Sequence, residues 1–275
     1  MADAPLDSSR PANRLTPWHY LIIACLIAFA ITAAVAVWVP LLATGAIASL
    51  LLGNLAAIPQ RNLKRLLAYS SVGHSGFILV AVICASAALT GKVLPSGNAD
   101  AAAGQTAVSV YLISYLLAPF TAFIVLAILE RRLPGLEIHH LAGLSQRSPL
   151  LAAAFAFSLV SLAGVPPLSG FIAKFLVILV AWNRGLYTLL GFAIFAAVAA
   201  LYYYLGPIKA MYWSEPLDET PIRLNRVTKG VLVALIALIL VTGFWAQSMF
   251  SLVDGALLGD NGPEPVPTAV AVVQH

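Results

Sequence analysis

Residues 149–184 read PLLAAAFAFSLVSLAGVPPLSGFIAKFLVILVAWNR, and this stretch decides which fold the chain can adopt. Both flanks are apolar and lack the two-residue alternation of a half-buried strand, so each flank predicts a helix. The centre, 164–170, holds two glycines and two prolines, which cannot continue a helix. The stretch therefore predicts one discontinuous helix. Its break is formed by Gly164, Pro166, Pro167 and Gly170.

The composition of the whole chain shows which solvent such helices face. Of its 275 residues, 61% are hydrophobic and 9% are charged, whereas soluble domains carry about 25% charged residues. So few charges cannot cover a surface that faces water. We therefore expect the chain to be embedded in a lipid bilayer. The 15 basic residues are spread along the sequence without a patch, so nucleic acid is excluded as a partner.

Outward from the central stretch, further apolar runs predict more spans. The run 21–59 has no charge over 39 residues, about twice what one crossing needs, so we expect a turn at Pro40. The fold class is an all-α polytopic transmembrane helical bundle of about seven or eight spans. We expect a polar N-terminal tail over 1–17, a membrane domain over 18–253 and a flexible C-terminal tail over 254–275. The spans outside 149–184 are expected at 18–38, 41–58, 62–87, 106–130, 187–212 and 229–253.

Basic residues in the loops give an orientation. With eight spans, nine basic residues collect on one face and five on the other, and the richer face is expected to be cytoplasmic. If 149–184 instead crosses once as a broken span, the later loops exchange sides.

Lys174 is the first candidate for chemistry, because no acidic residue lies within nine positions of it in this apolar stretch. Ionisable groups inside membrane spans usually face a protein interior or a water path. The ordinary alternative is a lysine that extends along lipid to the headgroups. The depth of the break decides between these interpretations.

His74 is the second candidate and lies in AYSSVGHSGF, residues 68–77. Imidazole titrates near neutral pH, so a histidine among hydroxyls can relay protons; the alternative is a buried neutral histidine bonded to a backbone carbonyl. Lys64 opens the same segment and, taken alone, is interpreted as an interfacial anchor. The run 202–204, three tyrosines, is interpreted as part of an interfacial aromatic belt. Gly53 and Asn54 are expected to let helices approach closely.

Motifs for cofactor chemistry are missing from the sequence. It has no glycine-rich phosphate loop, no dinucleotide fingerprint and no cysteine set for an iron–sulfur cluster. The adjacent His139 and His140 do not share a helix face, which argues against a metal site there. The chain is therefore expected to carry no redox centre and no metal, and the remaining chemistry is the movement of an ion.

Three stretches together resemble a known family. They are GNLAAIPQRNLKRLLAYSSVGHSGFILV (53–80), LAGLSQRSPLLAAAFAFSLVSLAGVPPLSGFIAKFLV (141–177) and AALYYYL (199–205). They are similar to the antiporter-like membrane subunits of respiratory complex I, NADH-quinone oxidoreductase, and most of all to its subunit N branch, the mitochondrial subunit 2 type. The similarity runs from about residue 41 to about residue 250. Multisubunit cation/proton antiporters and membrane-bound hydrogenases share the first two motifs.

The resemblance implies roles for the candidate residues. Lys174 matches the lysine of the discontinuous helix in the C-terminal half-channel, His74 a position on the proton path, and Lys64 a motif lysine of the same helix. Family members have about fourteen spans in two inverted repeats, so the chain resembles the C-terminal half only.

The resemblance also implies an activity and a setting. The implied activity is proton translocation in the bacterial inner (plasma) membrane, driven by quinone reduction elsewhere in the complex. NADH, FMN, iron–sulfur clusters and quinone are then expected in partner subunits, and other membrane subunits of complex I are the expected partners. The alternatives are a subunit of a cation/proton antiporter or of a membrane-bound hydrogenase, and a non-conducting truncated scaffold half.

Overall fold

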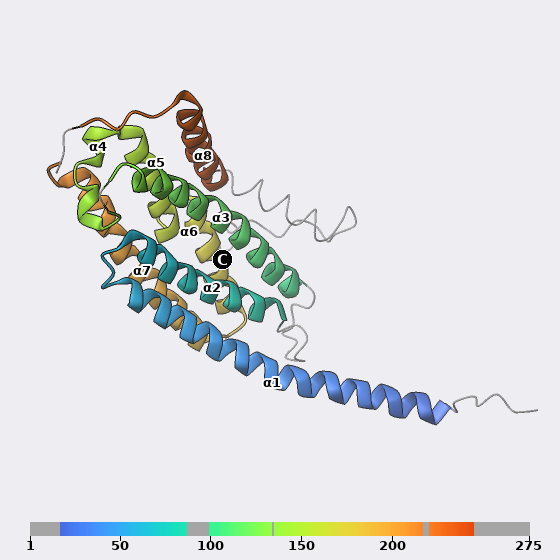
Figure 1. The fold of residues 1–275 in the computed structure, drawn as a ribbon. Coiled ribbons are helices and arrows are strands. Elements are labelled where there is room, and N and C mark those ends of the chain that lie inside the picture. The colour runs from blue at the N-terminus through green and yellow to red at the C-terminus, as the bar shows by residue number, and fades with distance from the viewer. Residues whose placement is uncertain (1–16, 87–98, 134, 217–219, 245–275) are drawn as a thin grey trace, which may run out of the picture. The chain divides into compact units, whose positions relative to one another are not determined.

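The protein was analysed as a computed structural model, which describes residues 17–86, 99–133, 135–216 and 220–244 (Figure 1). These residues form helices and no named strand, which confirms the predicted all-α class. The predicted tails, 1–17 and 254–275, lie outside the described residues apart from position 17. The elements are α1 (Pro17–Ala57), α2 (Leu63–Ser86), α3 (Ala99–Glu130), the 3-10 helix η2 (Ile138–Leu141), α4 (Leu144–Arg147), α5 (Pro149–Ala163), α6 (Ser169–Asn183), α7 (Tyr187–Trp213) and α8 (Arg226–Phe244).

Among the described residues, five helical segments are long and apolar enough to cross a membrane, which confirms the polytopic membrane bundle. They are Val37–Ala57, Leu63–Ser86, Ala103–Glu130, Tyr187–Trp213 and Arg226–Phe244. Helices α5 and α6 have 15 residues each, so each is about 22 Å long and falls short of the roughly 30 Å hydrocarbon core.

The predicted turn at Pro40 is wrong, because α1 continues through it as one helix. A single proline removes one backbone hydrogen bond, and helices in membranes tolerate this loss. The sequence WVPLLATG offers no second proline beside Pro40, and its nearest glycine is Gly45. Residues Met1–Pro40 and Leu41–His275 form two compact units, and everything below concerns the second unit.

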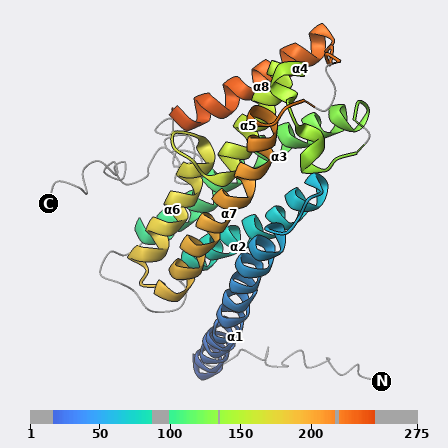
Figure 2. The same cartoon turned by 90° about the vertical axis from the view of Figure 1, so that its left-hand side faces the viewer.

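The predicted break in the central stretch is confirmed. Helix α5 ends at Ala163, and α6 begins at Ser169. Gly164, with φ of +84°, has the left-handed backbone that terminates many helices. The halves pack along α3 one after the other (Figures 1 and 2): the Ser158 hydroxyl of α5 donates to the Ala118 carbonyl at 2.8 Å, and α6 packs on Val110. Together they cross once, antiparallel to α3.

This single broken crossing overturns the nine-to-five division of basic residues, because the later loops exchange sides. The Gly143 amide donates to the Ala210 carbonyl near the end of α7, and the Ile222 amide donates to the Arg147 carbonyl. The segments around 210 and 222 therefore lie at the end where α5 begins. We call this the basic end, and its basic residues are Arg61, Lys64, Arg65, Arg131, Arg132, Arg147, Lys209, Arg223, Arg226 and Lys229. Arg184 follows the end of α6 and interacts electrostatically with Cys84 in the last turn of α2, so it lies at the opposite end.

The basic end is expected to face the cytoplasm, since cytoplasmic loops are rich in lysine and arginine. After replacement of the native cysteines, Arg131→Cys and Asn183→Cys provide one exposed thiol at each end. A membrane-impermeant maleimide should label position 183 in intact cells and position 131 only in inverted vesicles. The reverse pattern would contradict this orientation.

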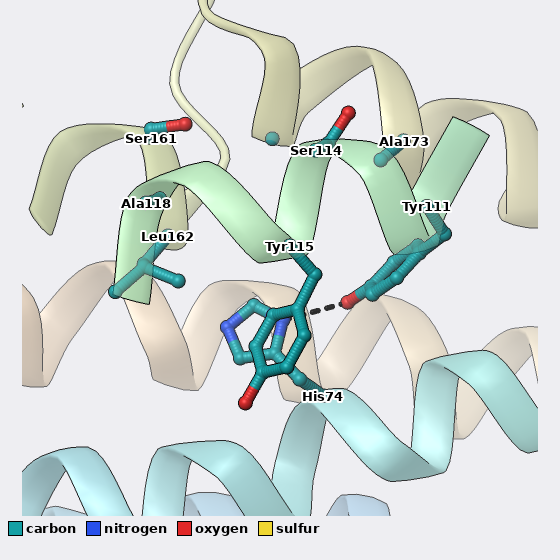
Figure 3. Close-up of a pocket in the computed structure, with 9 residues that line it drawn as sticks. His74, Tyr111, Ser114, Tyr115, Ala118, Ser161, Leu162 and Ala173 are labelled. Atoms are coloured by element: carbon teal, nitrogen blue, oxygen red, sulfur yellow. Dashed lines mark hydrogen bonds between the residues drawn. The ribbon is translucent and has the colours of Figure 1, made fainter. Parts of the chain in front are cut away.

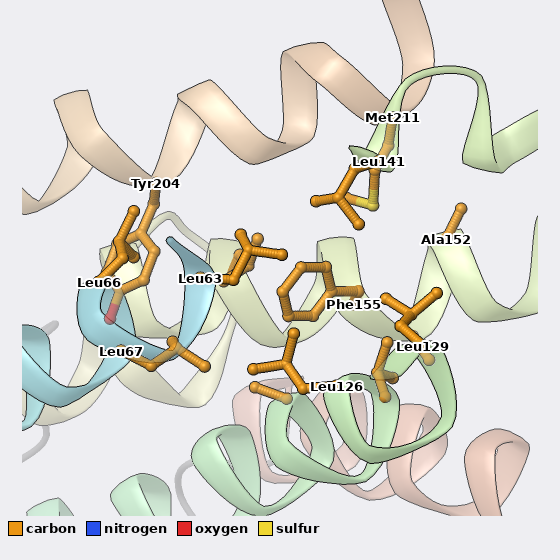
Figure 4. Close-up of a cluster of buried hydrophobic side chains, with 14 of the residues drawn as sticks. Leu63, Leu66, Leu67, Leu126, Leu129, Leu141, Ala152, Phe155, Tyr204 and Met211 are labelled. Atoms are coloured by element: carbon orange, nitrogen blue, oxygen red, sulfur yellow. The ribbon is translucent and has the colours of Figure 1, made fainter. Parts of the chain in front are cut away.

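An apolar core fills the basic-end half of the bundle. Leu63 and Leu66 of α2, Leu126 of α3 and Phe155 of α5 are each at most 1% exposed, and Met211 of α7 joins them (Figure 4). Because lipid is as apolar as these side chains, they stabilise the bundle by close van der Waals packing rather than by their removal from water.

Candidate functional site

Lys174 lies inside the protein, held by the end of the preceding half-helix. Its side chain is buried, and its Nζ atom donates to the carbonyl oxygens of Leu162 at 2.8 Å and Ala163 at 2.9 Å. The last carbonyls of a helix have no partner within it and carry the negative end of its dipole. The interruption between α5 and α6 thus leaves carbonyl oxygens at the end of α5 that accept hydrogen bonds from this amine.

The depth of Lys174 argues against the interpretation that it extends to the headgroups. Its Nζ lies 5.4 Å from the centre of the Phe77 ring, and Phe77 follows Leu63, the first residue of α2, by fourteen positions, about 21 Å along the helix. At the break, a Cβ atom on Gly164 would lie 2.9 Å from the Lys174 Cδ atom. The lysine therefore lies in the middle of the bundle beside the break.

His74 is buried on α2 and bonded to a tyrosine rather than to a backbone carbonyl. Its Nδ1 atom lies 2.7 Å from the Tyr111 hydroxyl of α3, and its ring centre lies 4.8 Å from that of Tyr115 (Figure 3). The Tyr111 ring stacks on Phe77, whose ring also faces Lys174. His74 and Lys174 are close enough to interact electrostatically.

A small cavity of about 10 Å³ lies beside His74 and reaches the break, near the lower limit of the volume that admits one water molecule. It is lined by Tyr111, Ser114 and Tyr115 of α3 and by Ser161 of α5 (Figure 3). The Ser114 hydroxyl is buried without a hydrogen-bond partner among the described residues. Hydroxyl and imidazole groups both donate and accept hydrogen bonds, so the lining is suited to passing protons.

Lys64 lies apart from this site. It pairs with Glu130 of α3 at 2.6 Å, with both side chains about half exposed at the basic end. Exposed ion pairs of this kind contribute about 0–1 kcal/mol. The structure therefore brings His74 and Lys174 together and leaves Lys64 outside the cluster.

The sequence interpretation missed two buried tyrosines. Tyr202 is 70% exposed, as a belt residue would be, but Tyr203 and Tyr204 are at most 5% exposed and hydrogen-bonded. The available signal was geometric, because successive residues of a helix point about 100° apart, so three in a row all face lipid only where lipid covers more than half of the helix. The close approach at Gly53 is confirmed, since a Cβ there would lie 2.4 Å from the Gly73 nitrogen.

Comparison with known proteins defines the class of this protein. Residues 19–200 match the family model described as "NADH:quinone oxidoreductase/Mrp antiporter, TM", and the chain belongs to this family. With its apolar spans, it is an integral membrane protein of the bacterial inner membrane, as predicted.

The curated relatives described next are both N subunits of NADH-quinone oxidoreductase. The chain is 40% identical over 224 residues to NADH-quinone oxidoreductase subunit N 2 of Roseiflexus castenholzii, covering 81% of this chain and 43% of that protein. It is 38% identical to subunit N of Rhodospirillum rubrum, covering 80% of this chain and 42% of that protein. The chain thus spans less than half the length of these curated relatives.

Solved structures of membrane complexes contain chains with the same fold. A chain of respiratory complex I from Thermus thermophilus superposes with a TM-score of 0.62 at 31% identity, covering 77% of this chain and 45% of that one. A chain of an archaeal membrane-bound sulfane sulfur reductase gives 0.69 at 26% identity, with coverages of 80% and 42%. A chain of the Mrp complex from Dietzia shares the fold at 22% identity, with a TM-score of 0.68 and coverages of 80% and 47%.

Proposed function

We propose that this chain supplies a lysine-based half-channel to a proton-translocating complex of the NADH-quinone oxidoreductase type. The observation that carries the proposal is the Lys174 amine, which is buried in the middle of the bundle, donates to the last carbonyls of α5 and interacts electrostatically with His74. The names of the subunit N relatives support the choice of complex.

In the proposed mechanism Lys174 is loaded and unloaded with a proton. Burial away from water favours a neutral amine, while the carbonyls of Leu162 and Ala163 and any carboxylate brought nearby favour the ammonium form. A change of charge in a neighbouring subunit can therefore shift the balance. The hydrogen bond between His74 and Tyr111 and the cavity beside it give the proton a place to go.

The driving reaction belongs to the partners in this proposal. Other antiporter-like and small membrane subunits of complex I would pack against the chain, and NADH, FMN, iron–sulfur clusters and quinone would be bound by partner subunits. This chain would then bind no cofactor and act only on protons.

Cation/proton antiport is the second candidate, favoured by the description of the matching family model, which names the Mrp antiporter beside NADH:quinone oxidoreductase. It would use the same lysine, and it predicts sodium-dependent transport in the absence of NADH and quinone. A non-conducting scaffold is the third candidate, and it predicts that Lys174 is dispensable for transport.

Gentle detergent purification of the tagged chain, followed by mass spectrometry, is expected to recover NADH- and quinone-reactive subunits. An untagged strain provides the control for adventitious binding. Recovery of antiporter subunits alone would favour the second candidate, and recovery of the chain without partners would contradict the complex I proposal.

A further inference from the structure

A second group of buried hydrogen bonds lies between His74 and the basic end. Ser70, one helical turn before His74 on α2, is hydrogen-bonded to the Tyr204 hydroxyl of α7. The Tyr203 hydroxyl donates to Asn54 Oδ1 of α1 at 3.2 Å and also contacts the Ser70 and Tyr204 side chains. All four side chains are buried. We call Asn54, Ser70, Tyr203 and Tyr204 the tyrosine cluster.

Tyr115 connects this cluster with the site around Lys174. Its ring lies against the His74 ring, with 4.8 Å between their centres, and it lines the cavity beside His74 (Figure 3). The same side chain lines a second, tighter pocket together with Ser70. Tyr115 therefore lies between the cavity and the tyrosine cluster, and it also interacts electrostatically with Tyr203.

The positions of the cluster residues along their helices place the cluster between His74 and the basic end. Ser70 lies seven residues after Leu63, the first residue of α2. Asn54 lies three residues before the end of α1, a distance of about 4.5 Å along the helix axis. The middle of this half is filled by the apolar core, and Tyr204 lies at the edge of that core (Figure 4). The hydroxyls of Tyr203 and Tyr204 thus bring polar groups into an otherwise apolar core.

We propose that the tyrosine cluster conducts protons between His74 and the basic end, a role that rests on the function proposed above. A proton from His74 reaches the cluster through the Tyr115 hydroxyl, and Tyr203 releases the last proton to a water molecule at the basic end. Each hydroxyl accepts a proton from one neighbour as it releases its own to the next, so every O–H bond broken is replaced by one formed. No electron moves, and no net charge stays on the cluster. Asn54 is a positioning residue that orients the Tyr203 hydroxyl.

The test is Tyr204→Phe, which keeps the ring and removes only the hydroxyl, with the exposed Tyr202→Phe as matched control. The readout is the number of protons moved per quinone reduced, measured on the purified complex in vesicles. For Tyr204→Phe we expect proton movement through this chain to slow about tenfold or more, and the protons moved per quinone to fall by the share that this chain contributes, since positioned groups typically accelerate proton transfer by at least about 10²-fold. Tyr202→Phe should match the unmodified complex.

A structural role would weaken the complex without changing the protons moved per turnover. Ser70→Ala is the second variant, since it removes the partner of Tyr204 with little change of volume. If Tyr204→Phe and Ser70→Ala both assemble and pump like the control, the cluster does not conduct protons. If Tyr204→Phe does not assemble, normal pumping by Ser70→Ala leads to the same conclusion. If Lys174→Met also pumps normally, the proposed half-channel function is contradicted as well. If only Lys174→Met loses pumping, the half-channel proposal stands and only the role of the tyrosine cluster is contradicted.

Discussion

Lys174→Met is expected to abolish proton translocation through this chain while the complex still assembles. Methionine has a similar length and an adaptable apolar side chain, so it fills the space beside Phe77 and the break. It provides no group that binds and releases a proton. The carbonyls of Leu162 and Ala163 lose their donor, at a cost of about 1–3 kcal/mol, which a membrane bundle of this size is expected to tolerate.

Lys174→Arg separates the structural role of this amine from its role in proton transfer. A guanidinium keeps a cation and hydrogen-bond donors near the α5 carbonyls, but it stays protonated in proteins. We therefore expect Lys174→Arg to assemble at least as well as Lys174→Met and to pump no better. The exposed Lys209 at the basic end provides the control, because Lys209→Met should pump normally.

Proton uptake into vesicles, divided by the amount of quinone reduced, is the appropriate measurement, with blue-native electrophoresis to follow assembly. Full pumping by Lys174→Met, or recovery of pumping in Lys174→Arg, would contradict the proposed role. Full pumping by Lys174→Met would favour the non-conducting scaffold. Recovery of pumping in Lys174→Arg would mean that the lysine only stabilises the C-terminal end of α5.

Gly170→Ala is expected to prevent stable folding of the membrane domain. A Cβ at this position would lie 1.8 Å from the Ser161 carbonyl oxygen and 2.7 Å from its carbon. These are backbone atoms of α5, so the conflict cannot be relieved by rotating a side chain. We expect a loss of about 3 kcal/mol or more, in the upper range for single substitutions, seen as a lower thermal midpoint in detergent.

Gly191→Ala is the matched control on α7, because nothing lies within 4 Å of a Cβ at that position. Its effect should be neutral or stabilising by up to about 1 kcal/mol, since alanine favours a helix over glycine. Equal thermal midpoints for the two variants would show that the close contact at Gly170 does not determine the stability of the break.

The break and its lysine could be predicted because the relevant signals are local. Two prolines and two glycines in seven residues stop a helix whatever its surroundings, and an isolated lysine in an apolar stretch is costly unless it has a specific environment. Pro40 could not be interpreted in the same way. One proline weakens a helix without ending it, and the surroundings decide the outcome.

The partners of the site could not be predicted, because they depend on helix packing. Tyr111 lies 37 positions after His74, and Ser70 and Tyr204 are 134 positions apart. Each pair comes from different helices that are apolar nearly all round, so no periodic polar face marks which side is buried. The nine-to-five division of the basic residues was wrong for a related reason, since it depended on whether α5 and α6 cross once or twice.

The position of Lys174 along α2 has an electrical consequence. The level of Phe77 lies roughly 60% of the way from the basic end along this helix. A full crossing of the membrane is worth about 2.3 kcal/mol per elementary charge at 100 mV, so loading Lys174 from the cytoplasm works against about 1.4 kcal/mol at that voltage. The occupancy of the lysine then changes about tenfold per 100 mV. Under the proposed function, a large membrane potential would therefore oppose protonation of Lys174 and so limit further proton translocation.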